Sequence, residues 1–305
     1  MVLILLFLCK QPFRHQPVLQ KQNIEVNSDC YGSHDQSSGA GEAKLRYHPG
    51  GGCAMLVKLQ IPALLVVTVM VFAVPGWRPS AAFGQGTEAR VQVLSPGVHN
   101  QRLPRTGEPA IHYAISIPAN YSPSRPVPLV LALHYGGDPN GAGRGVLSIL
   151  VGPALAELGA IIVAPDSVGG GWSTPENESA VNTLLEAVLA SYSIDTKKIV
   201  VTGFSMGGAG VWHFAGKYPD RFSAAVPVSG RPPASAAGWR VPVLAVHSRN
   251  DEVVPIGPAE TRIAELKKAG LRAEFIALTG ISHYETNRFV DGLRRAVPWI
   301  KETWK

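Results

Sequence analysis

Short apolar runs alternate with longer helical patterns from residue 83 to the end of the chain. Several runs are apolar at every position, as in Leu129-Val130-Leu131-Ala132-Leu133 and Ala160-Ile161-Ile162-Val163-Ala164. Continuous apolar strands are typical of a parallel sheet that helices cover on both faces. The predicted strands are Arg90–Leu94, Ile111–Ile117, Pro128–Leu133, Ala160–Ala164, Lys198–Thr202, Ala224–Val228, Val241–His247 and Ala273–Leu278.

The stretches between these strands have helical spacing and helix-end signals. Pro175-Glu176 and Pro258-Ala259-Glu260 put proline and acid in a first turn, and Gly270 follows two lysines as a stop. The predicted helices are about Gly145–Leu158, Glu176–Ser191, Met206–Tyr218, Pro258–Gly270 and Asn287–Glu302. This alternation predicts one α/β domain over residues 85–305. Its mostly parallel central sheet has about eight strands with helices on both faces, and Arg90–Ile117 forms an antiparallel hairpin at one edge.

The segment 55–84 has the order of a secretory signal. A basic Lys58 precedes the apolar run Ile61–Val74, and small residues follow at Ser80-Ala81-Ala82, so cleavage is expected after Ala82 or Gly84. The rival interpretation is a membrane anchor over residues 59–75, although the run has only about 14 residues against the roughly 20 that span a bilayer. The protein is therefore expected to be secreted or periplasmic, without stable membrane association after cleavage.

After a short apolar start, residues 1–54 are polar and glycine- and serine-rich, and they lack the periodicity of a folded unit. We interpret them as a non-native or disordered extension before a natural start at Met55, the alternative being a cytoplasmic tail before an uncleaved anchor.

Composition narrows the function classes. The chain is 46% hydrophobic and 16% charged with a formal charge of +6, which fits a globular protein, and no basic stripe with interleaved aromatics predicts nucleic-acid binding. All three cysteines, Cys9, Cys30 and Cys53, precede residue 83. A processed chain would therefore have no thiol nucleophile and no cysteine-ligated metal.

The stretch Gly203-Phe204-Ser205-Met206-Gly207 follows an apolar strand and opens into a helix. Such a turn holds its central serine in a strained conformation, and the flanking glycines let strand and helix approach without a Cβ clash. The alternative is a glycine-rich turn without chemistry, so the interpretation of Ser205 as a nucleophile requires a base and a carboxylate.

Both partners are expected at the carboxyl ends of other strands. Asp251 lies in the loop past Val241–His247 and is the predicted carboxylate, with Glu252 as the nearest rival and Asp166 as an organiser of its own loop. His283 lies between the last strand and the last helix and is the predicted base, whereas His247 is expected to brace the acid loop. We find no nearby carboxylate pattern for His99, His112 or His213.

Backbone donors for an oxyanion are expected in the turn His134-Tyr135-Gly136-Gly137-Asp138, which ends an apolar strand. Tyr135 or Gly136 would supply one amide and Met206 the other. Trp172, in the glycine-rich segment 169–174, and His134 are candidate substrate-binding residues; the alternatives are a surface loop and a chain reversal.

These motifs, in the order His134-Tyr135-Gly136-Gly137, Gly203–Gly208, Asp251 and His283, resemble the α/β-hydrolase superfamily. The stretches Asp195–Gly208 and Tyr218–Phe222 are similar to phospholipase/carboxylesterase-like and to polyhydroxybutyrate-depolymerase or feruloyl-esterase-like secreted esterases. One departure is Tyr135, where such relatives usually have glycine; backbone donation there requires a negative φ.

The resemblance implies carboxylic ester hydrolysis through an acyl-serine, with no metal or organic cofactor. Gly230–Arg240 leaves room for only about ten residues before the next strand, so no large cap domain is expected. The site should be open to a small-molecule or polymer-borne ester. A peptidase of the same fold and a non-catalytic binding protein are the competing classes, and the sequence does not predict an oligomeric state.

Overall fold

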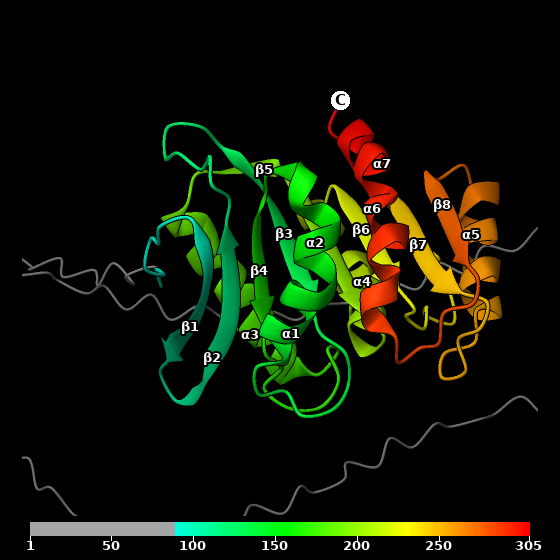
Figure 1. Cartoon of the computed structure of the whole chain (residues 1–305), viewed down its shortest axis with the longest axis horizontal. Helices are drawn as coiled ribbons and strands as arrows, with labels where there is room; N and C mark the ends of the chain where they lie inside the picture. Colours follow the sequence, from blue (N-terminus) through cyan, green and yellow to red (C-terminus); the bar gives the residue numbers. More distant parts are fainter. Residues whose placement is uncertain (1–88) are drawn as a thin grey trace, which may run out of the picture. The chain divides into compact units, whose positions relative to one another are not determined.

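The structure, a computed structural model, describes residues 89–305, and an eight-stranded sheet runs through this part of the chain (Figure 1). The predicted signal segment 55–84 and the extension 1–54 lie outside the described residues. The strand order is β1-β2-β4-β3-β5-β6-β7-β8. The strands are β1 (Gly97–Arg105), β2 (Glu108–Ile117), β3 (Val127–Leu133), β4 (Ile161–Pro165), β5 (Ile194–Phe204), β6 (Ala224–Val228), β7 (Val243–Ser248) and β8 (Ala273–Leu278).

The sheet is parallel from β4 to β8 and antiparallel at one edge, where β1 pairs with β2 and β2 with β4. The mostly parallel sheet predicted from the apolar runs is confirmed. Alternate residues of β3 explain why its run is apolar at every position. Leu129, Leu131 and Leu133 pack in one core, whereas Val130 and Ala132 pack in the other.

Helices cover both faces, as predicted. One face carries α3 (Pro175–Ser191), α4 (Met206–Lys217) and α5 (Gly257–Lys268), whose apolar residues share one core. The other carries the helical stretch 142–158, made of α1 (Ala142–Val146), a π turn (Leu147–Val151), α2 (Gly152–Leu155) and a 3₁₀ turn (Ala156–Leu158). On this face also lie a 3₁₀ turn (Thr286–Phe289), α6 (Val290–Arg294) and α7 (Ala296–Thr303). A 3₁₀ turn (Pro219–Arg221) follows α4.

The first predicted strand is wrong. Arg90–Leu94 forms no strand; the amides of Val91 and Leu94 instead donate to Ser191 Oγ and Tyr192 Oη. The edge strand is Gly97–Arg105, which the sequence hid because it buries only Leu103. The hairpin itself is present, since β1 pairs with β2.

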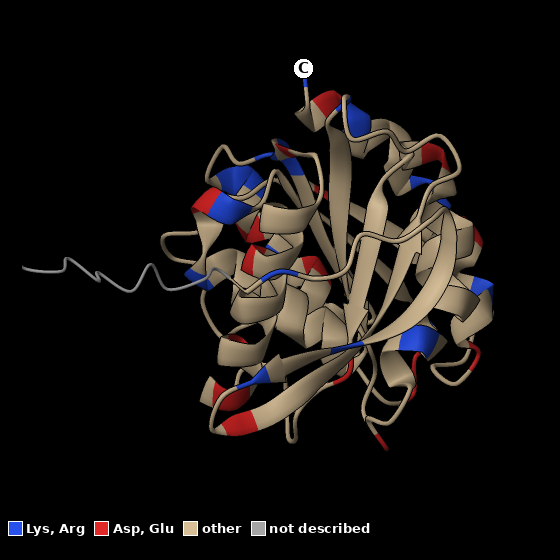
Figure 2. Cartoon of the chain, turned by 90° about the vertical axis from the view of Figure 1, so that its left-hand side faces the viewer, with Lys and Arg blue, Asp and Glu red and all other residues tan. Residues whose placement is uncertain are grey.

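Charge is confined largely to the helices and loops (Figure 2). Strands β3, β4, β6 and β7 contain no Lys, Arg, Asp or Glu. Residues 229–242, between β6 and β7, form no helix or strand, in agreement with the absence of a large cap at this point. Within residues 89–305, no helix has both the length and the hydropathy needed to cross a bilayer.

Candidate active site

Ser205 lies at the sharp turn between β5 and α4, with φ 56° and ψ −114°. The turn is possible because strand and helix backbones approach closely. A Cβ at Gly207 would lie 2.0 Å from the carbonyl oxygen of Leu133, and one at Gly203 would lie 2.6 Å from the carbonyl oxygen of Gly207. The Ser205 amide donates to the carbonyl of Val228 at 3.0 Å, which ties the turn to β6. Close backbone packing and this hydrogen bond therefore hold the main chain of Ser205 in place.

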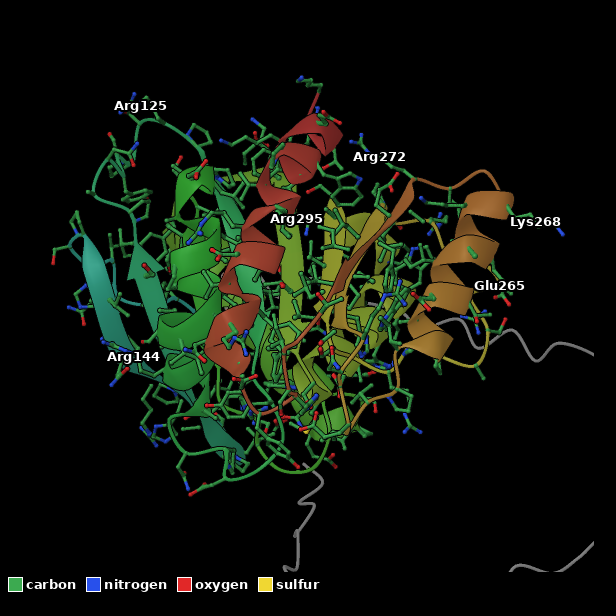
Figure 3. All side chains as sticks on the ribbon, turned by 45° about the vertical axis from the view of Figure 1, so that its right-hand side comes forward. Arg125, Arg144, Glu265, Lys268, Arg272 and Arg295 are labelled. Atoms are coloured by element: carbon green, nitrogen blue, oxygen red, sulfur yellow. The ribbon has the colours of Figure 1, made fainter. Side chains whose placement is uncertain are left out.

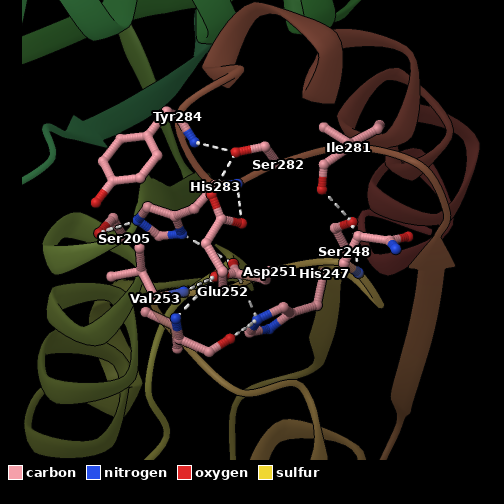
Figure 4. A network of polar contacts seen from close by, with 12 residues as sticks. Ser205, His247, Ser248, Asp251, Glu252, Val253, Ile281, Ser282, His283 and Tyr284 are labelled. Atoms are coloured by element: carbon pink, nitrogen blue, oxygen red, sulfur yellow. Dashed lines mark hydrogen bonds and ion pairs between the residues drawn. The ribbon is translucent and has the colours of Figure 1, made fainter.

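His283 lies between Ser205 and Asp251 (Figure 4). Its Nε2 is 2.8 Å from Ser205 Oγ and its Nδ1 is 2.8 Å from Asp251 Oδ2. The structure thus brings together the three side chains that the sequence predicted, from the ends of β5, β7 and β8. The imidazole ring also packs against Phe204, with ring centroids 5.1 Å apart.

The Asp251 side chain is fully buried and its carboxylate is fully engaged. Oδ1 accepts from the amides of Val253 at 3.0 Å and Val254 at 2.7 Å. Burial raises the pKa of the Asp251 carboxyl, but hydrogen bonds from His283, Val254 and Val253 outweigh it and hold the pKa below its ordinary value. The carboxylate is thus ionised and able to orient an imidazole.

His247 braces this loop, as the sequence predicted. Its Nε2 donates to the carbonyl of Val254 at 2.8 Å and lies 3.3 Å from Asp251 Oδ2. Burial lowers the pKa of His247, only partly offset by the bond to Val254 and the charge of Asp251. A neutral ring with a proton on Nε2 fits these contacts.

Residues 248–254, which run on from the last residue of β7 and which we call the acid loop, hold the backbone that carries His283 through every second side chain from Ser248 to Glu252. Ser248 Oγ donates to the carbonyl of Ile281, and Asn250 Oδ1 accepts from the amide of Gly280. Glu252 accepts from the Ser282 hydroxyl and from the His283 amide, the latter at 3.1 Å (Figure 4). Glu252, the rival for the acid, thus contacts the main chain of His283 while Asp251 contacts its ring.

The turn after β3 lies beside the nucleophile. A Cβ at Gly136 would be 3.9 Å from Met206 Cβ and Sδ, so the two predicted donor segments are adjacent. Among the described residues with a side chain, only Ser205 and Ser229 have positive φ. Tyr135 therefore has the negative φ that backbone donation from a bulky residue requires at this position.

His134 and Trp172 lie under this turn, and the prediction that they bind substrate is wrong. His134 is fully buried and Trp172 is 2% exposed. The Trp172 indole donates to the carbonyl of His134 at 2.9 Å. Both support the turn from below because their side chains face the core, a direction that position at a strand end does not reveal.

The contacts of His134 fix its tautomer. Nε2 accepts from the Ser167 amide at 2.9 Å, so Nδ1 carries the proton and donates to the carbonyl of Tyr135 at 2.5 Å. Burial lowers the pKa of His134, which keeps the ring neutral. This histidine thereby fixes the direction of the Tyr135 carbonyl.

Two other residues have contacts that bear on the predictions. Asp166 accepts from the amides of Gly141 and Gly143, so it organises the segment that follows the turn at residues 134–138. His213 contacts Glu178, which also accepts from Lys217. The expectation that His213 has no nearby carboxylate was wrong, because the partner lies on another helix.

A pocket of about 720 Å³ opens over Ser205 and His283. Its walls include the side chains of Tyr135, Ile149, Phe204, Val253 and Tyr284. Tyr284 is 78% exposed and packs edge-on against the His283 ring, with centroids 5.9 Å apart. Large apolar side chains in contact with solvent are typical of a binding site.

Comparison with known proteins gives a consistent result. A family model described as the alpha/beta hydrolase fold matches residues 139–249. Feruloyl esterase C of Emericella nidulans is 30% identical over 53% of this chain and 64% of its own length. Feruloyl esterase D of Neurospora crassa is 27% identical over 63% of this chain and 69% of its own. The chain thus spans about two thirds of the length of these relatives.

Among solved structures, the ferulic acid esterase AmCE1/Fae1A of Anaeromyces mucronatus aligns with a TM-score of 0.52 and 17% identity, covering 69% of this chain and 94% of that one. At this identity the likeness shows the fold. The predicted resemblance to the α/β-hydrolase superfamily and to its feruloyl-esterase-like members is confirmed.

Proposed function

We propose that this chain, an α/β hydrolase, cleaves carboxylic esters through an acyl-serine intermediate. The observation that carries the proposal is the continuous chain of hydrogen bonds from Asp251 through His283 to Ser205, with 2.8 Å at each step. Nucleophile, base and orienting carboxylate in such contact are the requirements for serine catalysis. The relatives named feruloyl esterase support the same activity.

In the first half of the reaction, Ser205 Oγ attacks the ester carbonyl carbon as its proton passes to His283 Nε2. The carbonyl oxygen becomes an oxyanion, and Asp251 stabilises the imidazolium through Nδ1–H. His283 then returns the proton to the alcohol oxygen, the C–O bond breaks, and the acyl group remains on Ser205.

Gly136 and Met206 are the proposed oxyanion donors. The Tyr135 carbonyl is held by His134 beneath the turn, and in a trans peptide the Gly136 N–H points the opposite way. The Met206 N–H opens α4 and has no partner within the helix. By contrast, Ser205 N–H is already bonded to Val228. Two such donors each contribute about 3 kcal/mol to an oxyanion transition state.

In the second half, water attacks the acyl carbon. His283 Nε2 takes a proton from the water, the same two amides hold the oxyanion, and the proton returns to Ser205 Oγ as the acid leaves. The cycle consumes one ester and one water, and it releases one alcohol and one acid.

An aromatic acyl group is the substrate that the pocket favours. Tyr135, Phe204 and Tyr284 contribute rings to its walls, and Ile149 and Val253 contribute apolar surface. Flat rings offer favourable contacts to a planar aromatic acid. We therefore propose esters of hydroxycinnamic acids as preferred substrates, in line with the names of the relatives.

The test is hydrolysis of a p-nitrophenyl ester series from acetate to palmitate, of methyl ferulate, and of peptide anilides. The intact protein should cleave esters, and Ser205→Ala should lower kcat by on the order of 10⁶-fold. Ser173→Ala, which alters an exposed serine, is the matched control. A fluorophosphonate should label the control and not Ser205→Ala. Cleavage of anilides without any ester turnover would make the protein a peptidase, and activity retained in Ser205→Ala would refute the mechanism.

Export is a separate proposal. It rests on the charged, apolar and small-residue order of residues 55–84. N-terminal sequencing of protein recovered outside the cytoplasm should begin after Ala82 or Gly84. A start upstream of residue 59 in membrane-bound protein would favour the anchor.

A further inference from the structure

The loop after β6 emerges between Ser205, which follows β5, and the loop with Asp251, which follows β7. In the sheet, β6 lies between β5 and β7, so residues 229–234 leave the sheet at the carboxyl ends of the strands, as Ser205 and Asp251 do. Contacts agree with this position: a Cβ at Gly230 would lie 2.2 Å from the carbonyl carbon of Gly208, in the first turn of α4. Arg231 follows directly and is exposed.

This loop forms one wall of a second pocket of about 570 Å³, which we call the proline pocket. Pro232 and Pro233 come from the loop, Pro255 comes from the segment beyond Asp251, and Pro258 and Thr261 come from α5. The walls are thus rigid and largely apolar, which suits the C–H faces of a ring-shaped ligand.

One short stretch of chain contributes to the proline pocket and to the pocket over Ser205, which we call the aromatic pocket. Val253 lines the aromatic pocket and the next residue, Val254, lines the proline pocket. The segment Val253-Val254 is therefore part of the wall of both pockets. An ester extends in two directions from its carbonyl carbon, and an aromatic acyl group in the first pocket leaves the second to the alcohol.

The charge of the proline pocket is positive. Arg231 and Arg262 both line it, and no acidic residue does. Arg262 is already committed, since it pairs with Glu265 and donates to the carbonyls of Pro233 and Ala234. On the same helix, Glu260 pairs with Arg249. In the part of the chain that the structure describes, no side-chain partner contacts the Arg231 guanidinium.

We propose that the proline pocket binds the alcohol part of the ester and that Arg231 selects alcohols bearing a carboxylate, namely acidic sugars. This inference rests on the proposed esterase function. Arginine forms paired hydrogen bonds with carboxylates, and proline rings contact the sugar's apolar face. A neutral sugar would contact the proline rings but would form no ion pair with Arg231.

The test compares two substrates that differ only in the carboxylate: feruloyl esters of glucose and of glucuronic acid, acylated at the same hydroxyl. The intact protein should have a kcat/KM about fivefold higher for the acidic ester, and Arg231→Gln should bring the ratio near one, since exposed ion pairs contribute this order of discrimination. The ratio should also fall at 0.5 M salt.

Arg125→Gln is the matched control. Arg125 is exposed and precedes β3, so it lies at the amino ends of the parallel strands, away from Ser205 and Asp251 at their carboxyl ends (Figure 3). It should leave the activity on both esters unchanged. An unchanged substrate ratio in Arg231→Gln, or an equal loss on both esters, would overturn the inference while leaving the esterase function intact. Failure of the intact protein to cleave either ester and methyl ferulate would instead refute the proposed function.

Discussion

Ser205 Oγ and His283 Nε2 lie 2.8 Å apart, but the two residues are held by different kinds of contact. Ser205 depends on main-chain packing, with Gly207 against the carbonyl of Leu133 and Gly208 against Gly230. His283 depends on polar side chains of the acid loop: Ser248, Asn250 and Glu252 bond the main chain of its loop, and Asp251 bonds its ring. The nucleophile half is therefore sensitive to added atoms, and the acid–base half to the loss of hydrogen-bonding side chains.

Within the acid–base half, the largest effect is expected from a change at Asp251. Asp251→Asn should keep the shape of the loop but lower kcat by about 10⁴-fold, because an amide cannot stabilise the imidazolium and favours the wrong tautomer. Asp220→Asn, at an exposed position, is the control and should retain full activity. Equal kcat values for the two variants would show that Asp251 is not the orienting carboxylate.

The nucleophile half should respond most to a single methyl group. Gly207→Ala would bring Cβ to 2.0 Å from the Leu133 carbonyl, so we expect a loss of about 3 kcal/mol in the free energy of unfolding, together with loss of ester hydrolysis. Gly257→Ala, where no atom lies within 4 Å of the added Cβ, should be neutral or stabilising. Denaturant unfolding of both proteins checks this, and a stable, active Gly207→Ala would contradict the packing argument.

Each half contains a buried neutral histidine, His134 or His247, whose pKa is lowered by burial. In the unfolded chain the pKa of histidine is about 6.5, so below this pH the unfolded state binds more protons. The free energy of unfolding should therefore fall as the pH drops from 7.5 to 5. His134→Gln and His247→Gln should each flatten this slope when the free energy of unfolding is measured against pH.

The smallest effect sharpens the role of Glu252. Glu252→Gln retains an acceptor for the His283 amide, whereas Glu252→Ala loses it. We expect kcat to fall roughly fivefold in the alanine variant, with little change in KM, because a displaced base works poorly while substrate contacts persist. Restoration of kcat by glutamine separates positioning from charge; identical kcat in both variants would assign the effect to charge alone.

Apolar runs were sufficient to predict the buried strands, and β6 and β8 have the predicted bounds. Asp251 and His283 were recognisable because each follows such a strand. The roles of Ser248, Asn250 and Glu252 were not, since their partners lie 30 to 33 residues away and only the packing of two loops brings them together.

Trp172 and His134 illustrate a second limit. A residue at a strand end can face the pocket or the core, and the sequence is the same in both cases. The glycines around Trp172 indicated an exposed loop, yet Asn177 ties that loop down by accepting from Val168 and donating to the carbonyls of Gly169 and Gly171. Buried polar anchors of this kind become visible only when the chain is folded.

The segment Val253-Val254 offers a route to altered selectivity. Its two amides hold Asp251, while Val253 lines the aromatic pocket and Val254 lines the proline pocket. Because the acid is held by the main chain, substitutions at residue 253 can reshape the acyl wall and substitutions at residue 254 the alcohol wall. A library at these two positions could therefore vary both specificities independently without removing a main-chain amide that holds the Asp251 carboxylate.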